Sequence, residues 1–271
     1  MKAKLAHYQN LWKLEEVQKL TSTETSDLYL VSSPHGPAVL KLLNEFGQKH
    51  EAVSAVFLRA CEGLGAARLF EWDQEAHLIE RLYGDNLYQF SKRGEEEKAS
   101  EEFVAIIKKI HKVSSSELNI PNFKELFNAY ERVSIPEEIH DLINLAREKV
   151  AELLKSQDQE VLLHGDLHHE NIMARSNGEF VCFDSQAWIG DPAYELGTTL
   201  KNPWDYPAVS HDAEVFQQRA AFFSKELELP LERIIGYAFV HCCLSICWGI
   251  EDKQPYDHSL AVAKMILPLL K

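Results

Sequence analysis

Short apolar runs separated by polar turns open the chain. After a lead-in, they cover residues 14–20, 28–31 and 38–43, and a turn rich in Pro and Gly separates the last two. Short β-prone runs joined by such turns are typical of an antiparallel sheet. Helical spacing over residues 50–58 is followed by two more β-prone runs, at 67–72 and 76–82. The first 82 residues therefore predict an antiparallel sheet with one helix.

The hydrophobic period changes after this point. Apolar residues recur at helical spacing in residues 86–112, 136–156, 211–227, 231–250 and 258–270. This spacing predicts amphipathic or buried helices. A short helical piece is expected around 123–133, a breaker at 83–85, and a loop over 198–210. Together the two halves predict an α+β protein whose second part, residues 83–271, is mainly helical.

One β-rich stretch interrupts the helical half and carries the clearest chemistry. An apolar run at 161–163 leads into His164, Gly165 and Asp166, and Asn171 follows five residues after the aspartate. A turn at 177–178 separates a short strand from a second apolar run, 180–183, which ends at Asp184. The pattern predicts a polar loop and a hairpin that bring two carboxylates and an amide together.

Phosphoryl transfer uses these residue types. One carboxylate orients the attacking hydroxyl and accepts its proton, while an amide oxygen and a second carboxylate hold Mg²⁺ on the nucleotide phosphates. Asp166 suits the first role, and Asn171 with Asp184 suits the second. The order of Asp, Asn and a later Asp matches the catalytic loop and metal-binding segment of protein kinases.

The motifs HGDLHHEN (164–171) and IGDPAYEL (189–196) resemble those of the aminoglycoside phosphotransferases. The branch they resemble is that of the streptomycin 6-phosphotransferases and hydroxyurea resistance kinases. The resemblance implies a protein-kinase-like fold of two lobes, residues 1–82 and 83–271, with ATP between them and Mg²⁺ bound. It does not separate ATP from GTP. It further implies that Asp191 braces the catalytic loop.

The resemblance also assigns the nucleotide site. Lys41 lies inside an apolar run, where a lysine needs a partner for its ammonium group. The family pattern implies that Lys41 contacts the α- and β-phosphates and is held by Glu51. It also implies that the carbonyl of Glu80 and the amide of Leu82 contact adenine. One departure is the first hairpin loop, residues 21–26, which contains no glycine; its phosphate contacts are unassigned.

Two other readings of the central stretch stay open. His164, Asp166, His168 and His169 are side chains that suit a transition metal, so the loop is also a candidate metal cluster. A nucleotide-binding module without catalytic activity is the other reading. Within the kinase hypothesis, the acceptor is a streptomycin-like aminoglycoside or another metabolite such as a sugar, an amino alcohol or hydroxyurea.

The net charge of the protein limits the classes of partner that we expect it to bind. The formal net charge of −14 disfavours nucleic acid and is suited to steering a cationic small molecule. The end of the helix at 231–250 resembles the helix that borders the acceptor pocket in the streptomycin kinase branch. Glu251 and Asp252 are therefore candidates for binding ammonium or guanidinium groups, and Asp205 of the loop at 198–210 is another. The five cysteines show no paired spacing typical of zinc sites or disulfide frameworks.

Without a signal peptide or membrane-length apolar run, we expect a cytoplasmic protein with no membrane partner. The oligomeric state is not indicated.

Overall fold

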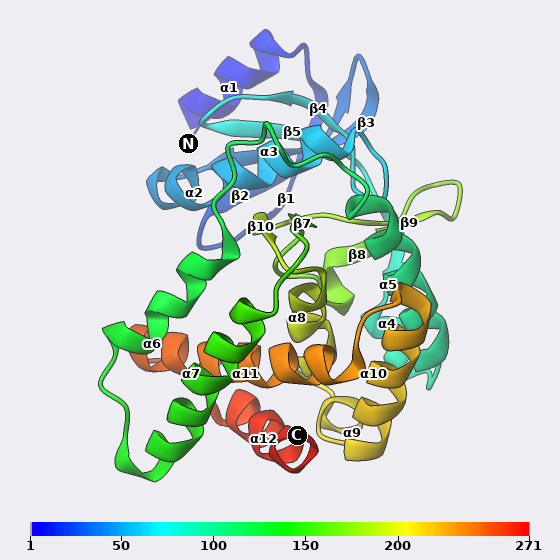
Figure 1. Ribbon diagram of the computed structural model, residues 1–271. Helices are drawn as coiled ribbons and strands as arrows, with labels where there is room; N and C mark the ends of the chain where they lie inside the picture. Colours follow the sequence, from blue (N-terminus) through cyan, green and yellow to red (C-terminus); the bar gives the residue numbers. More distant parts are fainter. Residues whose placement is uncertain (1, 271) are drawn as a thin grey trace.

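The computed structural model describes residues 2–270, which form a small lobe and a large lobe (Figure 1). The small lobe is built on a five-stranded antiparallel sheet with the order β1-β2-β3-β5-β4. Its strands are β1 (Glu15–Ser22), β2 (Ser26–Ser33), β3 (Gly36–Leu43), β4 (Leu69–Trp72) and β5 (Ala76–Glu80). The predicted sheet is confirmed; β2 is longer than expected by two residues at each end, whereas β4 begins and β5 ends two residues short of the expected bounds.

The two faces of this sheet have different roles. Side chains of a strand alternate between the two faces of the sheet. Those on one face pack with Tyr8 and Leu14 in a small core. They include Tyr29, Val31, Leu40, Leu42 and Leu78. The register pairs Leu28 with Lys41 and Lys41 with His77. These residues belong to the opposite face, which therefore looks toward the large lobe.

A helix that the sequence did not indicate covers the outer face of the sheet. Residues 2–11 were expected as a lead-in, and they form α1 (Lys2–Leu11). Tyr8 Oη donates to the Asp73 carboxylate at 2.8 Å, and Lys4 Nζ donates to the carbonyl of Leu43 at 2.7 Å. These partners lie 39 and 65 residues away in the chain, so tertiary contacts, which local spacing does not reveal, hold the helix.

The helix expected over 50–58 is two helices in the structure. These are α2 (Glu45–His50) and α3 (Ala52–Cys61), and Glu51 lies at the junction between them. Buried side chains of α3, including Phe57 and Leu58, pack into the core of the large lobe. The helix thus joins the two lobes although it lies within the first 82 residues.

A small sheet follows the connection between the lobes. Residues 83–85, expected to break the strand pattern, begin β6 (Tyr83–Asn86), which pairs with β8 (Ile172–Ala174). Strand β8 also pairs with β9 (Phe180–Cys182), and these two form the predicted hairpin. The pairing of β6 links the start of the large lobe to the stretch that carries the motif residues 164–184.

Helices make up most of the large lobe. They are α4 (Tyr88–Lys92), α5 (Glu96–Ile110), α6 (Ala129–Arg132), α7 (His140–Lys155), α8 (Glu195–Lys201), α9 (Pro207–Ser210), α10 (Ala213–Leu227), α11 (Leu231–Asp252) and α12 (Asp257–Ile266). The single helix expected over 86–112 is divided near Gly94, which has a positive φ of 73°. The loop expected over 198–210 is partly helical, because the end of α8 and all of α9 lie within it.

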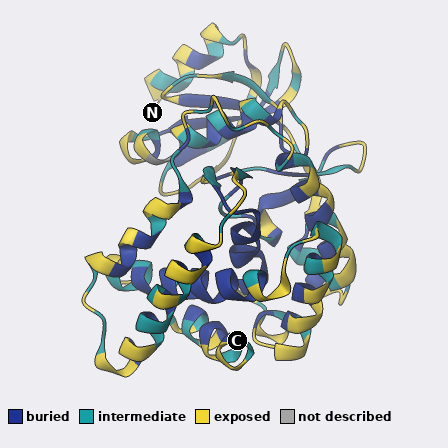
Figure 2. Cartoon of the chain, viewed as in Figure 1, coloured by how far each residue is buried: buried dark blue, intermediate teal, exposed yellow. Residues whose placement is uncertain are grey.

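Helix α11 is the centre of the large core. Its 22 residues are long and apolar enough to cross a membrane by length and composition, yet 72% of the apolar window is buried inside the protein. Figure 2 shows buried residues concentrated along α8, α11 and the interior of the sheet. Cys242, Cys243 and Cys247 are buried free thiols of this helix, as expected for core residues.

Candidate active site

Two short strands hold the loop that carries Asp166. Strand β7 (Val161–Leu163) enters the loop and pairs with β10 (Trp188–Gly190). Gly165 has φ of 80°, and a Cβ there would lie 2.5 Å from Cδ1 of Trp188. The tight packing and the left-handed conformation together explain why glycine precedes the aspartate.

Glu195 is the acid that fixes this loop. Its carboxylate accepts hydrogen bonds from the backbone amides of His164 (2.7 Å) and Gly165 (3.0 Å). Asp191, which was expected to brace the loop, instead caps the turn before α8 by accepting from Ala193 N, and it pairs with Arg233. The expectation for Asp191 is therefore wrong in its detail: Glu195 makes the direct contacts, because it lies one helical turn further along the chain.

His164 connects the loop to the segment that carries Asp184. Its Nδ1 accepts from the amide of Asp166 at 3.3 Å, and its Nε2 lies 2.9 Å from the carbonyl of Phe183. Only a neutral ring with the proton on Nε2 satisfies both contacts. Burial lowers the pKa of His164, which agrees with that neutral form. The residue thereby couples the positions of Asp166 and Asp184.

Asp166 and Asn171 lie next to one another. Asn171 Nδ2 donates to the backbone carbonyl of Asp166 at 3.0 Å, and no described residue donates to its Oδ1. The Asp166 carboxylate is half-exposed and lies 3.7 Å from Nε2 of His168. Burial opposes its ionisation, but the hydrogen bond and charge of His168 outweigh it and lower the pKa of Asp166 to about 2. The carboxylate is consequently ionised at neutral pH.

Lys41 forms a bridge between the lobes. Its Nζ donates to Asp184 Oδ1 at 2.7 Å and forms an ion pair with Glu51. Burial lowers the pKa of Lys41, but the two carboxylates outweigh it and raise the pKa overall. The predicted Lys41–Glu51 pair is present, and Asp184 joins it. Asp184 itself adopts a left-handed backbone conformation, with φ of 61°, and its exposed second oxygen remains available.

A cavity of about 550 Å³ lies beneath the inner face of the sheet. Its walls are largely apolar side chains from both lobes, including Leu28, Leu30, Val39, Ile79, Met173 and Phe183. Lys41 and Asp184 line one part of it, and Glu80 with Leu82 lines another. An apolar slot that ends at a few polar groups is the usual form of a small-molecule site. Thr23 and Thr25 of the hairpin without glycine also line it.

Arg175 is a residue that the sequence patterns did not single out. Its guanidinium donates to Glu80 Oε1 at 2.7 and 2.9 Å and to the carbonyls of Gly63 and Ala66, both at 2.9 Å. The Glu80 side chain is thus used in a buried ion pair between the lobes. The predicted adenine contacts involve only backbone groups of Glu80 and Leu82, and they remain predictions.

The candidate metal cluster of the loop histidines does not form. His164 and His168 have the partners described above, and His169 Nε2 lies 3.1 Å from Glu96. Arg219 pairs with the same carboxylate at 3.0 Å. Within residues 2–270, no group of three or more His, Cys, Asp or Glu side chains has a geometry that could hold a metal ion. His169 instead ties the catalytic loop to α5 and α10.

Two of the three candidate acceptor residues, Glu251 and Asp252, are neighbours at the end of α11, and Asp205 lies in another segment. Glu251 forms a two-pronged ion pair with Arg132 at 2.8 and 2.9 Å. Asp252 ends α11, and Asp205 lies exposed in the segment between α8 and α9. The role of all three in acceptor binding stays a prediction.

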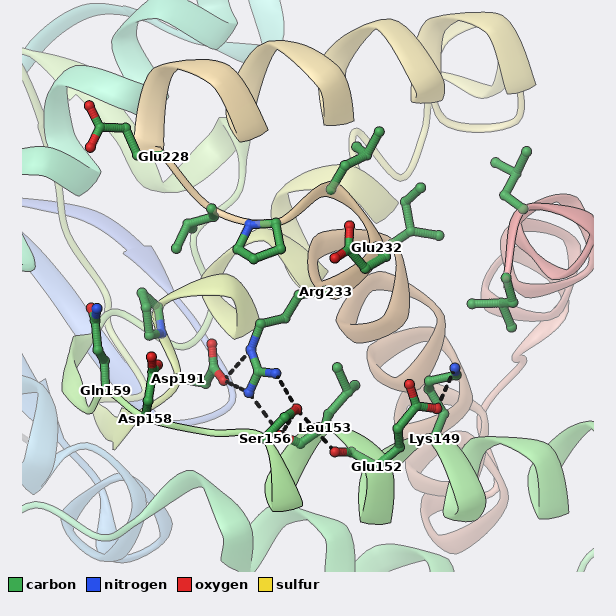
Figure 3. Close-up of a pocket in the computed structure, with 17 residues that line it drawn as sticks. Lys149, Glu152, Leu153, Ser156, Asp158, Gln159, Asp191, Glu228, Glu232 and Arg233 are labelled. Atoms are coloured by element: carbon green, nitrogen blue, oxygen red, sulfur yellow. Dashed lines mark hydrogen bonds and ion pairs between the residues drawn. The ribbon is translucent and has the colours of Figure 1, made fainter.

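A second and larger hollow, of about 870 Å³, lies between the end of α7 and the start of α11. Figure 3 shows Arg233 at its base, directed toward Asp191, Ser156 and Leu153. Among the described residues, it shares no lining residue with the smaller cavity. Arg233 already has protein partners, so we interpret this hollow as a place where structural elements meet and not as a ligand site.

Comparison with known proteins agrees with this geometry. Residues 11–253 match the model of the aminoglycoside/hydroxyurea antibiotic resistance kinase family. The chain is 27% identical over 252 residues to streptomycin 6-kinase of Streptomyces griseus, covering 89% of this chain and 80% of that one. It is 25% identical over 247 residues to streptomycin 3''-kinase of Klebsiella pneumoniae, covering 89% and 90%.

A solved structure extends the comparison to the fold. The aminoglycoside phosphotransferase APH(4)-Ia, in ternary complex with ADP and hygromycin B, superposes with a TM-score of 0.69 at 11% identity, covering 99% of this chain and 98% of that one. At that identity the likeness shows the protein-kinase-like fold alone, as predicted. The family match covers most of the chain, and the chain is therefore a phosphotransferase of the aminoglycoside/hydroxyurea antibiotic resistance kinase family.

Proposed function

We propose that the protein transfers the γ-phosphoryl group of ATP to a hydroxyl group of a small molecule in the cytoplasm. The observation that carries the proposal is that Lys41 of the small lobe reaches Asp184 at the apolar cavity, while His164 links the loop of Asp166 to Phe183, the residue before Asp184. Such a site positions a nucleotide against a hydroxyl, and positioning with charge neutralisation provides most of the rate in phosphoryl transfer.

Asp166 orients the acceptor hydroxyl. A carboxylate with a pKa of about 2 is a weak base, so it accepts the proton late, when the new P–O bond has largely formed. Its main contribution is to hold the hydroxyl in line with the phosphoryl group. Lys41, fixed by Glu51 and Asp184, neutralises charge on the nucleotide phosphates.

The residues at the site fit Mg²⁺. Asn171 Oδ1 and the free oxygen of Asp184 are hard oxygen donors, and two protein ligands completed by phosphates are typical of Mg²⁺. These two residues would hold the ion. When bound, Mg²⁺ neutralises negative charge on the phosphates and fixes their orientation. ATP is proposed over GTP on the resemblance to the family, since no described side chain has been assigned to read the base.

A streptomycin-like aminoglycoside is the first acceptor to test, because curated relatives at about 25% identity are streptomycin kinases. The acidic charge of the protein supports a cationic acceptor, with Asp205, Glu251 and Asp252 as the proposed ligands of its cationic groups. A metabolite kinase is the second candidate.

Mass spectrometry of the acceptor tests the proposal. Incubation with ATP and Mg²⁺ should add one phosphoryl group to an acceptor from a panel of aminoglycosides, sugars, amino alcohols and hydroxyurea. Removal of the metal by chelation should stop the reaction. If no acceptor gained a phosphoryl group while the protein bound Mg-ATP, the reading of a nucleotide-binding module without catalytic activity would replace the kinase proposal.

A further inference from the structure

The hairpin loop without glycine, residues 21–26, is a compact turn that keeps a free backbone donor. Thr23 Oγ1 accepts from the amide of Ser26 at 3.1 Å, and the amide of Thr23 donates to the carbonyl of Ser26 at 2.8 Å. These two bonds close the turn around Glu24 and Thr25. Among the residues that the structure describes, none accepts a hydrogen bond from the amide of Thr25.

The loop lies at the end of the cavity that Lys41 occupies. Strand β3 pairs Ala38 with Glu80 at one end. At its other end it pairs Leu43 with Ser26 of the loop, and Lys41 lies between these two points. Both threonines of the loop line the cavity. Under the proposed function Lys41 marks the phosphate end of the nucleotide, so the loop lies at that end as well.

Helix α2 holds the loop through its first residues. Asn44 Nδ2 donates to the carbonyl of Glu24 at 2.6 Å, and the Asn44 amide donates to the carbonyl of Thr25 at 2.9 Å. Asn44 Oδ1 also accepts from the amide of Gly47 at 2.9 Å and so caps the helix. In a planar trans peptide the N–H points opposite to the C=O. The free Thr25 amide, which shares a peptide with the Glu24 carbonyl, therefore points away from α2.

Only glycine fits at position 47 behind the loop. A Cβ on Gly47 would lie 2.2 Å from the carbonyl oxygen of Thr25 and 3.1 Å from its carbonyl carbon. These are backbone atoms, so a side chain at this position would displace the loop itself. The carbonyl of Gly47 accepts from the amide of Glu51 at 2.8 Å, and Glu51 is the partner of Lys41. The same helical turn thus sets the positions of the loop and of the Lys41 ion pair.

We propose that Asn44 and Gly47 are positioning residues for the nucleotide phosphates. They hold the loop against α2, so that the amide and the hydroxyl of Thr25 bind a phosphate group beside Lys41. A loop rich in glycine approaches phosphates closely with its own bare backbone. In this protein the glycine lies in the helix behind the loop and lets helix and loop approach each other. The inference rests on the proposed binding of a nucleotide in this cavity.

Nucleotides that differ only in their phosphates test the proposal. Binding of adenosine, ADP and a non-hydrolysable ATP analogue, each with Mg²⁺, is measured by isothermal titration for the wild type and for Gly47→Ala. We expect the wild type to bind the two phosphorylated compounds more tightly than adenosine. Gly47→Ala should weaken their binding about 10- to 100-fold, the size of one hydrogen bond to a charged group, and leave adenosine binding unchanged. Equal losses for all three compounds, or no loss for any, would overturn the proposal.

A second variant separates the loop contact from the folding of the helix. Serine is as good an N-cap as asparagine, so Asn44→Ser keeps α2, but a short hydroxyl replaces the amide that reaches the Glu24 carbonyl. We expect a loss of about 3- to 10-fold for the phosphorylated compounds alone. Gly236→Ala is the matched control, because a Cβ there would meet only the end of the Leu153 side chain, at 3.3 Å. If Gly47→Ala does not fold, Asn44→Ser decides: an unchanged preference for the phosphorylated compounds would overturn the proposal.

The kinase function is scored separately by ADP release from ATP with the acceptor panel. A phosphate preference that Gly47→Ala removes, in a protein that phosphorylates no acceptor, would uphold the role of α2 and contradict the kinase function. Turnover by Gly47→Ala with the wild-type KM for ATP would uphold the kinase function and overturn the role of α2.

Discussion

Asp184 has two tasks at the scale of single residues. One oxygen receives Lys41 Nζ at 2.7 Å, and the other is free for a metal ion. Its left-handed backbone conformation is uncommon for a residue other than glycine and is found where function requires it. Asp184 therefore holds the lysine from the small lobe and a ligand position at the same time.

Asp184→Ala should weaken the binding of Mg-ATP more than that of ATP measured without metal. The loss of a charged ligand and of the Lys41 ion pair should cost about 1.5–3 kcal/mol, or roughly 10- to 100-fold in Kd. Isothermal titration with and without Mg²⁺ measures this difference. Asp141→Ala, at an exposed acid of α7, is the control. Equal losses with and without the metal would argue against the metal-binding role.

The residue types at the site were largely predictable from the sequence, but several of their contacts were not. Motif spacing pointed to Asp166, Asn171 and Asp184, and the resemblance to the family added Lys41 and Glu51. It did not identify Arg175, because an arginine after a short strand has no distinguishing pattern. It also assigned the bracing role to Asp191, since both acids occur in one motif and only the fold shows which carboxylate reaches the loop.

At the scale of elements, two buried charge networks hold the site in place. Glu195 binds the amides of the catalytic loop, and Arg175 joins the β8–β9 hairpin to the end of β5 through Glu80. Both contacts fix backbone segments that carry functional groups. The sequence predicted these strands from their apolar runs. It missed α1, which long-range contacts hold in place, and α8, which is buried on all sides. Neither situation leaves an amphipathic pattern in the sequence.

Glu195→Gln should slow turnover more than it weakens nucleotide binding. The glutamine side chain is uncharged and has one acceptor oxygen, so both loop amides lose a charged partner and one of them loses its acceptor. We expect kcat to fall about 10- to 100-fold, corresponding to about 1.5–3 kcal/mol, while the KM for ATP changes little. Steady-state kinetics of ADP release measures both. A large rise in KM with unchanged kcat would contradict the account of the loop.

Arg175→Met should destabilise the protein strongly. It leaves the buried Glu80 carboxylate without its partner, which costs about 3–5 kcal/mol. The double variant Arg175→Met with Glu80→Gln should recover part of this loss, because the unpaired charge is gone. Urea unfolding measures each free energy of unfolding, and Arg93→Met, at an exposed ion pair, is the control. No difference between Arg175→Met and that control would show that the pair contributes little.

At the scale of the whole molecule, many histidines are buried in their neutral form. Burial lowers the pKa of His77 and His169 from 6.5 to about 4, and it lowers the pKa of His164 and His241 as well. Below pH 6.5 the unfolded chain binds protons at these positions and the folded protein does not. Stability is therefore full above pH 6.5 and is lost as the pH falls toward 4.

The urea midpoint should accordingly fall steadily between pH 6.5 and about 4. The Glu96 carboxylate acts in the same direction at lower pH, since the charge of Arg219 and contact with His169 overcome burial and lower its pKa to about 2. His169→Asn should flatten part of the dependence. A midpoint that is constant or rises on acidification would contradict the neutral, buried histidines.

The central claim is that Asp166 orients a small-molecule hydroxyl for phosphoryl transfer from Mg-ATP. The most direct test is acceptor-dependent ADP release by the wild-type protein and by Asp166→Ala, with nucleotide binding measured in parallel. The panel holds streptomycin and other aminoglycosides beside sugars, amino alcohols and acidic alcohols. We predict turnover with at least one acceptor in the wild type, and its loss in a variant that still binds Mg-ATP. Turnover that persists in Asp166→Ala, or a wild-type protein that binds Mg-ATP and phosphorylates nothing, would contradict the claim.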